Sequence, residues 1–322
     1  TGPLGQGVAN GVGMAMAARF VRGLLTDKND LENSELFSPN IWVLCSDGDL
    51  QEGISAEASS LAGTQKLGNL KVIYDDNRIS IEGDTHLAFT EDVSARYKSY
   101  GWEVFEVEIK KDGNVDREKF ETAALSALKI NDRPVLIRLK SVIAWPAPSA
   151  KGTAKSHGSA LGADEVAKTK AVLGFDETKS FYVDEKVLAH AREVKTRAET
   201  LYKEWDKKFQ SWRHANPEKG KLFDRIKNLD IPTNLELPKF EDKDKKGIAT
   251  RAASGKVINT LAKQLPELWG GSADLADSNN TTIENGGSFL PRASTMKTAD
   301  EYGRIIHFGI REHAMAAIAN GI

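Results

Sequence analysis

Two polar turns, each following a short apolar run, carry the residues best suited to chemistry. Asp47 and Gly48 come directly after the run at residues 41–45, and Asn77 closely follows the run at 70–74. Short apolar, β-favouring runs are typical of strands buried on both faces of a parallel sheet. Open α/β sheets bind their ligands at the carboxyl ends of such strands. We therefore expect Asp47 and Asn77 to lie at one edge of a sheet.

These residue types predict a metal and diphosphate site. A carboxylate, an amide oxygen and a nearby backbone carbonyl suit Mg²⁺, which prefers a few protein oxygens together with phosphate oxygens and water. Gly48 lets a ligand approach the backbone closely. A helix predicted over residues 52–66 would direct free N–H groups at an anion. The alternative is that Asp47 and Asn77 are ordinary helix and turn caps.

Composition limits the function classes. The 322 residues are 40% hydrophobic and 28% charged with a net charge of −2, which allows roughly two domains of ~150 residues. The near-neutral balance does not favour nucleic acid or an anionic membrane as a partner. Cys45 is the only cysteine, which excludes a disulfide framework and fits the cytoplasm. We also expect no signal peptide and no membrane span, and the missing initiator Met suggests a start inside a longer chain.

The glycine-rich turn at residues 1–7 leads into a predicted buried helix over residues 8–25. A glycine-rich loop that opens a helix suits a phosphate or a cofactor ring. A dinucleotide fingerprint is excluded, because the glycine spacing is wrong and no strand precedes the turn. A simple packing turn remains the alternative.

Strands and helices then alternate, which predicts a parallel α/β sheet. Helices are expected over residues 91–100 and 116–130, and strands over 103–109 and 135–140. A long loop at residues 145–152 leads to His157, which we expect on a loop beyond the carboxyl end of a strand. Such a position favours a functional role, although a lone histidine is often incidental.

The middle of the chain is charged and helical. Residues 184–228 carry Trp205, Phe209 and Trp212, which we expect to pack the segment on the first domain. Acidic residues are mixed with the basic ones throughout, so a solvated helix face is a better interpretation than a nucleic-acid surface. Residues 230–246 are predicted to form an exposed linker. The predicted domains are therefore 1–183 and 247–322, joined by a connecting segment at 184–246.

The last unit begins with a helix at residues 249–265 that carries Arg251 in its first turn. A short strand and turn at 268–275, a polar loop at 278–282 and a strand at 304–308 follow, and residues 309–313 open a final helix. A single strand–loop–strand–helix passage cannot close an α/β sheet, so we expect this second domain to be incomplete.

With these segments in view, the chain resembles the transketolase family. The resemblance is carried, in the family's order, by residues 1–7, Asp47-Gly48 with Glu52-Gly53, residues 74–81, Ser156-His157-Gly158, Ala249-Thr250-Arg251, residues 270–275 with Ser278-Asn279, and residues 308–313. The segments at 145–148 and 268–271 are similar to the actinobacterial members. The fingerprint for thiamine diphosphate (ThDP) usually begins with Gly, where this chain has Ser46.

The resemblance implies a parallel-sheet ThDP-binding fold followed by the beginning of a pyrimidine-binding domain. It implies that Asp47, Asn77 and the carbonyl of Ile79 bind Mg²⁺, with Ca²⁺ or Mn²⁺ as alternatives. The implied cofactor-binding residues are Gly2, Pro3, Leu4, Gly48, Glu52, Asn77, His157 and Asp274. The site would form at the interface of a cytoplasmic homodimer.

The implied reaction belongs to the pentose phosphate pathway. Through the ThDP ylid, a two-carbon ketol unit passes from a ketose phosphate such as xylulose 5-phosphate to an aldose phosphate such as ribose 5-phosphate or erythrose 4-phosphate. The resemblance assigns the sugar phosphate to His157, Arg251 and Ser278. It assigns catalysis to His157 and to Glu312, which would protonate the pyrimidine ring.

Other functions stay open at this point. The chain could belong to a phosphoketolase, a 2-oxo acid dehydrogenase component or deoxyxylulose-phosphate synthase, or be a non-catalytic part of a split enzyme. Compared with the family, it lacks N-terminal and C-terminal portions with further active-site residues. We therefore expect the isolated chain to be inactive or poorly folded.

Overall fold

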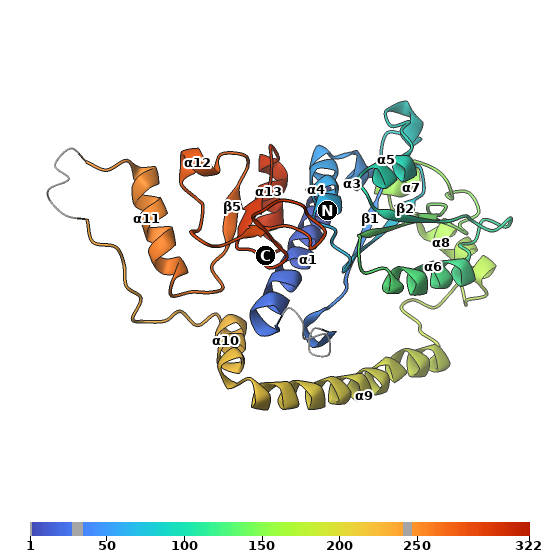
Figure 1. Cartoon of the computed structure of the whole chain (residues 1–322). Helices are drawn as coiled ribbons and strands as arrows, with labels where there is room; N and C mark the ends of the chain where they lie inside the picture. Colours follow the sequence, from blue (N-terminus) through green and yellow to red (C-terminus); the bar gives the residue numbers. More distant parts are fainter. Residues whose placement is uncertain (1, 28–34, 241–246) are drawn as a thin grey trace.

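The computed structural model describes residues 2–27, 35–240 and 247–322, and Figure 1 shows their arrangement. The first sheet contains β1 (Ile41–Ser46), β2 (Leu70–Asp76), β3 (Glu103–Val107) and β4 (Val135–Lys140). Its strand order is β1-β2-β4-β3, and all three pairings are parallel. The predicted parallel α/β alternation is therefore confirmed.

Helices precede, connect and follow these strands along the chain. They are α1 (Gln6–Leu25), α3 (Asp47–Gln51), α4 (Gly53–Thr64), α5 (Val93–Ser99), α6 (Arg117–Lys129), α7 (Lys155–Gly158) and α8 (Ala163–Leu173), with 3-10 turns η1 (Glu35–Phe37) and η2 (Thr85–Leu87). The sequence did not predict α3 or α7. Residues 47–51 include Gly and two Asp, which have low intrinsic helix propensity.

Helix α1 packs on the first sheet through small residues. A Cβ atom at Gly11 would lie 2.3 Å from Val43 Cγ2, so only glycine allows this helix to approach β1 so closely. Val12 and Met16 are fully buried in the same core, together with Leu50 and Ile54 from α3 and α4. This core fixes where β1 ends and α3 begins.

The long helix α9 (Glu185–Ala215) and α10 (Pro217–Asn228) run along one side of the molecule (Figure 1). The predicted aromatic anchor is confirmed, because Phe209 and Trp212 are buried against Leu25 and Phe37. The rings of Phe37 and Trp212 meet edge to face with centroids 4.7 Å apart. The expected linker has no regular secondary structure over 230–240, and its residues 241–246 lie outside the described part of the chain.

The second sheet is also parallel, with order β5-β8-β6-β7. Its elements are α11 (Thr250–Ala262), β5 (Gly270–Ser272), α12 (Ala276–Asn279), β6 (Ser288–Phe289), β7 (Ala299–Asp300), β8 (Ile305–His307) and α13 (Glu312–Ala319). The two expected strands are present as β5 and β8. The strands β6 and β7 were not predicted, because they are two-residue strands formed by tertiary pairing without an apolar run. The turn of α12 also replaces part of the expected polar loop.

The two sheets are joined through α1. A Cβ at Gly13 would lie 2.1 Å from the Ile318 carbonyl oxygen, so α13 packs directly on α1. Phe20 stacks on Trp269 with ring centroids 4.2 Å apart. These contacts make α1 a shared helix between the two sheets.

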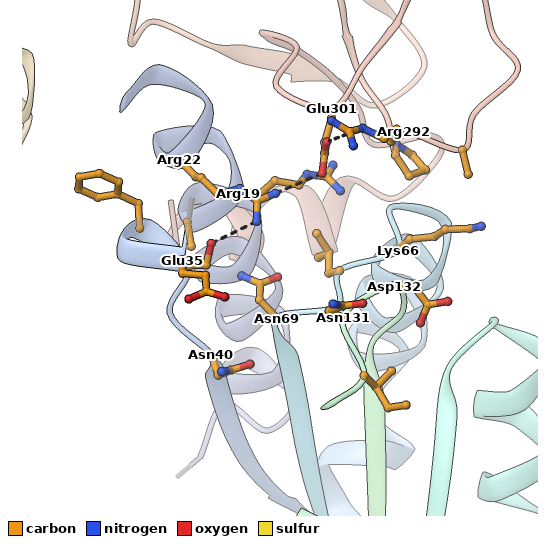
Figure 2. A pocket seen from close by; sticks show the side chains of 18 of the residues that line it. Arg19, Arg22, Glu35, Asn40, Lys66, Asn69, Asn131, Asp132, Arg292 and Glu301 are labelled. Carbon is orange, nitrogen blue, oxygen red and sulfur yellow. Dashed lines mark hydrogen bonds and ion pairs between the residues drawn. The ribbon is translucent and has the colours of Figure 1, made fainter. Parts of the chain in front are cut away.

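Ion pairs continue this junction at the amino-terminal edge of the first sheet. Glu301 accepts from Arg22 at 3.2 Å and lies 3.6 Å from Arg292. Figure 2 shows these residues above Asn69 and Asn131, around a polar cavity of about 590 Å³. This cavity lies at the opposite edge of the sheet from Asp47 and Asn77. Among the described residues, no helix is both long and apolar enough to cross a membrane.

Candidate cofactor site

The carboxyl ends of β1 and β2 bring Asp47 and Asn77 into contact. The two strands are parallel neighbours with Ser46 paired to Asp75, so the residues that follow them lie side by side. Asp47 Oδ2 accepts hydrogen bonds from the backbone N–H of Asn77 at 3.2 Å and of Arg78 at 3.1 Å. Strand order thus joins two polar residues that are 30 positions apart.

The Asp47 carboxylate is held in one orientation inside the protein. It is 2% exposed, and its Oδ1 accepts from the Tyr74 hydroxyl at 2.7 Å. Burial raises the pKa of Asp47, while the hydrogen bonds from Tyr74, Arg78 and Asn77 oppose that rise. Burial also raises the pKa of Tyr74. The hydroxyl therefore stays protonated and donates a hydrogen bond to Asp47. Three hydrogen bonds use three of about four acceptor positions on the carboxylate, which leaves one for a ligand.

The Asn77 amide is oriented by its neighbours. Its Nδ2 donates to Asp75 Oδ2 at 3.2 Å, and its Oδ1 accepts from the Ile79 N–H at 3.0 Å. Asp75 Oδ1 in turn accepts from the Ser141 hydroxyl at 2.5 Å. Sequence reasoning missed Asp75 and Ser141 as supporting residues, and the acidic pair before Asn77 was the only available signal for Asp75.

The donor chemistry at this edge fits a hard divalent cation. Asp47, Asn77 and the backbone of Ile79 offer only oxygen atoms, which Mg²⁺, Ca²⁺ and Mn²⁺ prefer. Across the described residues, no group of three or more His, Cys, Asp and Glu side chains could hold a metal ion. A cation here would therefore need further oxygens from a bound ligand, such as those of a diphosphate.

The glycine-rich turn lies against the same edge. A Cβ at Gly48 would be 3.0 Å from Leu4 Cδ1, so these two residues are neighbours. Gly5 adopts a left-handed conformation with φ of 73°, and a Cβ there would lie 2.7 Å from Ile54 Cγ2. Gly2, Pro3 and Leu4 are exposed. The turn therefore presents its backbone to solvent beside Gly48.

The helix expected over residues 52–66 is shorter than predicted. The helix α4 begins at Gly53 and ends at Thr64, and Glu52 is its exposed, extended N-cap. The preceding turn, α3, begins at Asp47 itself. Its first residues, rather than those of α4, lie at the end of β1.

His157 lies on α7 and not on the expected loop, because residues 155–158 form one helical turn. Its ring is exposed and forms no hydrogen bond with the residues that the structure describes. The preceding loop is fixed by Glu165, a residue that sequence reasoning missed. Its carboxylate accepts from the N–H groups of Ser149 and Ala150 and from the Ser149 hydroxyl. The hydrogen bond from that hydroxyl lowers the pKa of Glu165.

The remaining predicted site residues are exposed on the second domain. Arg251 lies in the first turn of α11 and Ser278 in α12, and these two helices contact each other. Asp274 occupies a left-handed turn with φ of 62° just before α12. Within the described part of the chain, no hydrogen bond or ion pair links these three side chains to Asp47 or Asn77.

Glu312 is the exposed first residue of α13. Contacts from α4 fix the start of this helix, because Glu57 Oε2 accepts from the Ala314 N–H at 3.0 Å and Arg311 donates to Ser60 Oγ at 3.1 Å. Sequence reasoning did not single out Glu57. The carboxylate of Glu312 therefore stands on a fixed helix end without a hydrogen bond to any described residue.

Comparisons with known proteins agree with this architecture. Residues 1–232 match the family "Transketolase, thiamine diphosphate binding domain", and residues 246–322 match "Transketolase, pyrimidine binding domain". The transketolase of Mycobacterium bovis is 49% identical over 326 aligned residues, and that of Geobacillus stearothermophilus is 42% identical over 326. Both alignments cover 100% of this chain and 46% of the relative.

Solved structures give the same result. Transketolases of Pichia stipitis in complex with xylulose 5-phosphate or sedoheptulose 7-phosphate superpose with TM-scores of 0.92 at 38% identity. Transketolase from Campylobacter jejuni superposes with a TM-score of 0.81 at 41% identity. Each covers 100% of this chain, which spans 46% of the solved chain.

The fold and the matched domains define a ThDP-binding α/β protein. More narrowly, the chain belongs to the transketolase family.

Proposed function

We propose that the protein to which this chain belongs is a transketolase of the pentose phosphate pathway. It would transfer a two-carbon ketol unit from a ketose phosphate such as xylulose 5-phosphate to an aldose phosphate such as ribose 5-phosphate or erythrose 4-phosphate. The observation that supports this most is the contact between Asp47 and Asn77 at the strand ends of a transketolase-family chain.

In this proposal the first sheet holds the cofactor. Asp47, Asn77 and the Ile79 carbonyl would hold Mg²⁺, with Ca²⁺ or Mn²⁺ as alternatives, and the Gly48 N–H would bond the diphosphate. Gly2, Pro3 and Leu4 would line the thiazolium ring, a role supported by the contact between Leu4 and Gly48. ThDP, when bound, supplies the reactive carbon and the electron sink for carbon–carbon bond cleavage.

The second part of the proposal concerns the sugar phosphate. His157, Arg251 and Ser278 would bind it, since a guanidinium fork and a hydroxyl suit a phosphate group. Their exposure keeps them accessible to a substrate. The sugar phosphate complexes of the solved relatives support this substrate class.

Glu312 would hold the proton that the pyrimidine ring nitrogen receives. A first-turn carboxylate that forms no hydrogen bond with the residues that the structure describes is suited to a group supplied from outside. We therefore also propose a homodimer in which each active site combines residues of two subunits, with Glu52 and Asp274 as further cofactor contacts. The single, buried Cys45 supports a cytoplasmic location.

The test is a donor and acceptor assay of the protein. With xylulose 5-phosphate, ribose 5-phosphate, ThDP and Mg²⁺, we expect glyceraldehyde 3-phosphate and sedoheptulose 7-phosphate. A second arm replaces ribose 5-phosphate with inorganic phosphate. Release of acetyl phosphate there, without sugar transfer in the first arm, would contradict the proposal and favour a phosphoketolase.

A further inference from the structure

Asp49, on the short helix α3, joins two segments of the candidate cofactor site. Its Oδ1 accepts a hydrogen bond from the Gly5 N–H at 2.9 Å, across 44 positions of sequence. Its Oδ2 accepts from the Ser46 N–H at 3.0 Å. One half-buried carboxylate therefore ties the glycine-rich turn to the end of β1.

The backbone of Asp49 is fixed as well. Its carbonyl oxygen accepts from the Ser55 hydroxyl at 2.5 Å, which ties α3 to the first turn of α4. Hydrogen bonds to an ionised acceptor are stronger than bonds between neutral groups. The carboxylate thus has a defined position from which to hold the turn.

The hydrogen bonds of Asp49 reach groups on both sides of the candidate site. Gly5 directly follows Leu4, and Ser46 directly precedes Asp47. Leu4 also contacts Gly48. If the bond to Gly5 were lost, the turn could move away from Gly48 while β1 and α4 stayed folded around their own core.

We infer that Asp49 is a positioning residue for the cofactor. It holds the backbone turn at residues 2–5 at a fixed distance from Gly48 and Asp47, so that the surfaces for the thiazolium ring and the diphosphate exist before the cofactor binds. A preformed site saves the ordering cost that a mobile turn would add to binding. This inference rests on the proposed function for its ligand.

The test compares Asp49→Asn with the native sequence, both in the protein to which this chain belongs. An amide offers one carbonyl oxygen and one NH₂ group, so either Gly5 or Ser46 loses its acceptor. The matched control is Asp184→Asn, because Asp184 also accepts from a backbone N–H, that of Lys186 at 2.8 Å, at the distant start of α9. Hydrogen exchange is measured for residues 2–6 without ligand, and ThDP binding is titrated with Mg²⁺.

We expect exchange at residues 2–6 to become about tenfold faster in Asp49→Asn, and the Kd for ThDP to rise about tenfold, as for one lost charge-assisted hydrogen bond. Exchange in β2 should stay slow, which would show that the variant is folded. The control Asp184→Asn should match the native protein in both exchange and ThDP affinity. Unchanged exchange at residues 2–6 would overturn the inference, as would faster exchange with unchanged ThDP affinity. If the native protein binds no ThDP, that result counts against the proposed cofactor site, and the exchange data still decide whether Asp49 holds the turn.

Discussion

At the edge of the first sheet, the Asp47 carboxylate is buried and accepts three hydrogen bonds, from Tyr74, Asn77 and Arg78. At the start of α13, the Glu312 carboxylate is exposed and forms no hydrogen bond within the described part of the chain. Both carboxylates lie at the start of a helix. Among the described residues, hydrogen bonds fix the orientation of Asp47 but not that of Glu312.

The difference follows from how each region is built. Adjacent parallel strands deliver Asp47 and Asn77 to one place and give them shared hydrogen bonds. Glu312 is placed by a helix whose packing face points to α1 and α4, which leaves its polar end outward. The polar groups of the first region are thus held in place, while Glu312 in the second region is left exposed. Each variant below tests one side of this contrast.

The largest expected effect is that of Glu312→Gln on turnover. We expect the activity of the protein to which this chain belongs to fall at least ~100-fold, because the variant lacks the carboxylate that we propose holds the pyrimidine proton. Stability should change by less than about 0.5 kcal/mol, because the side chain is exposed. Turnover is measured by sugar phosphate transfer and stability by urea unfolding.

Glu185→Gln is the matched control, since Glu185 is also an exposed first-turn acid, in α9. It should leave turnover and stability unchanged. Full activity in Glu312→Gln would show that this carboxylate has no part in the reaction.

Tyr74→Phe tests whether the hydrogen bonds to Asp47 fix its carboxylate for ligand binding. Loss of the hydroxyl that donates to Asp47 should weaken Mg²⁺-dependent ThDP binding about tenfold, because the carboxylate can then turn away from the proposed metal position. Calorimetric titration at fixed Mg²⁺ measures the affinity. Tyr97→Phe is the control, because it removes a buried hydroxyl that meets Ser59 away from the site. Equal losses in the two variants would mean that Tyr74 acts only through stability.

Glu57→Ala tests which contact holds the start of α13, the helix that carries Glu312. Its carboxylate accepts from the Ala314 N–H, so removal should lower the free energy of unfolding by about 1.5 kcal/mol. Urea unfolding followed by circular dichroism gives this value. Glu121→Ala, an exposed acid on α6, should have almost no effect. A Glu57→Ala variant as stable as the native chain would mean that the hydrogen bond from Ala314 does not help to hold α13.

The smallest expected effect is that of Ser46→Gly on ThDP affinity, below tenfold or roughly 1.4 kcal/mol. Glycine keeps the N–H that donates to Asp49, while the hydroxyl bond to the Asp75 carbonyl, 3.1 Å long, is lost. Titration with ThDP measures the change. A larger loss would mean that the serine hydroxyl helps to fix the two strand ends.

Much of the fold could be predicted from periodicity. The strand at residues 135–140 was predicted with the bounds it has, because Arg133-Pro134 marks its start and an apolar run follows. The helix α3 was missed because its residues are poor helix formers, and β6 and β7 because two-residue strands leave no pattern. These short elements depend on tertiary contacts, and such contacts cannot be predicted from the periodicity of apolar residues in the sequence.

The candidate site could be predicted only in part. The residue types of Asp47 and Asn77 pointed to a metal, and their strand positions to a shared edge. Asp49, Asp75 and Glu165 were missed, because they act through hydrogen bonds to backbone or side-chain groups that only the folded chain brings near. The roles of His157, Arg251, Ser278 and Glu312 remain predictions, since the structure does not join them to Asp47.

The decisive measurement is Mg²⁺-dependent ThDP binding by the protein to which this chain belongs, made beside its Asp47→Ala variant. We predict binding that requires Mg²⁺, disappears on addition of a chelator and is lost in Asp47→Ala, with the variant's fold checked by circular dichroism. Binding that is indifferent both to Mg²⁺ and to Asp47 would contradict the assignment of the β1 and β2 strand ends as the metal and diphosphate site.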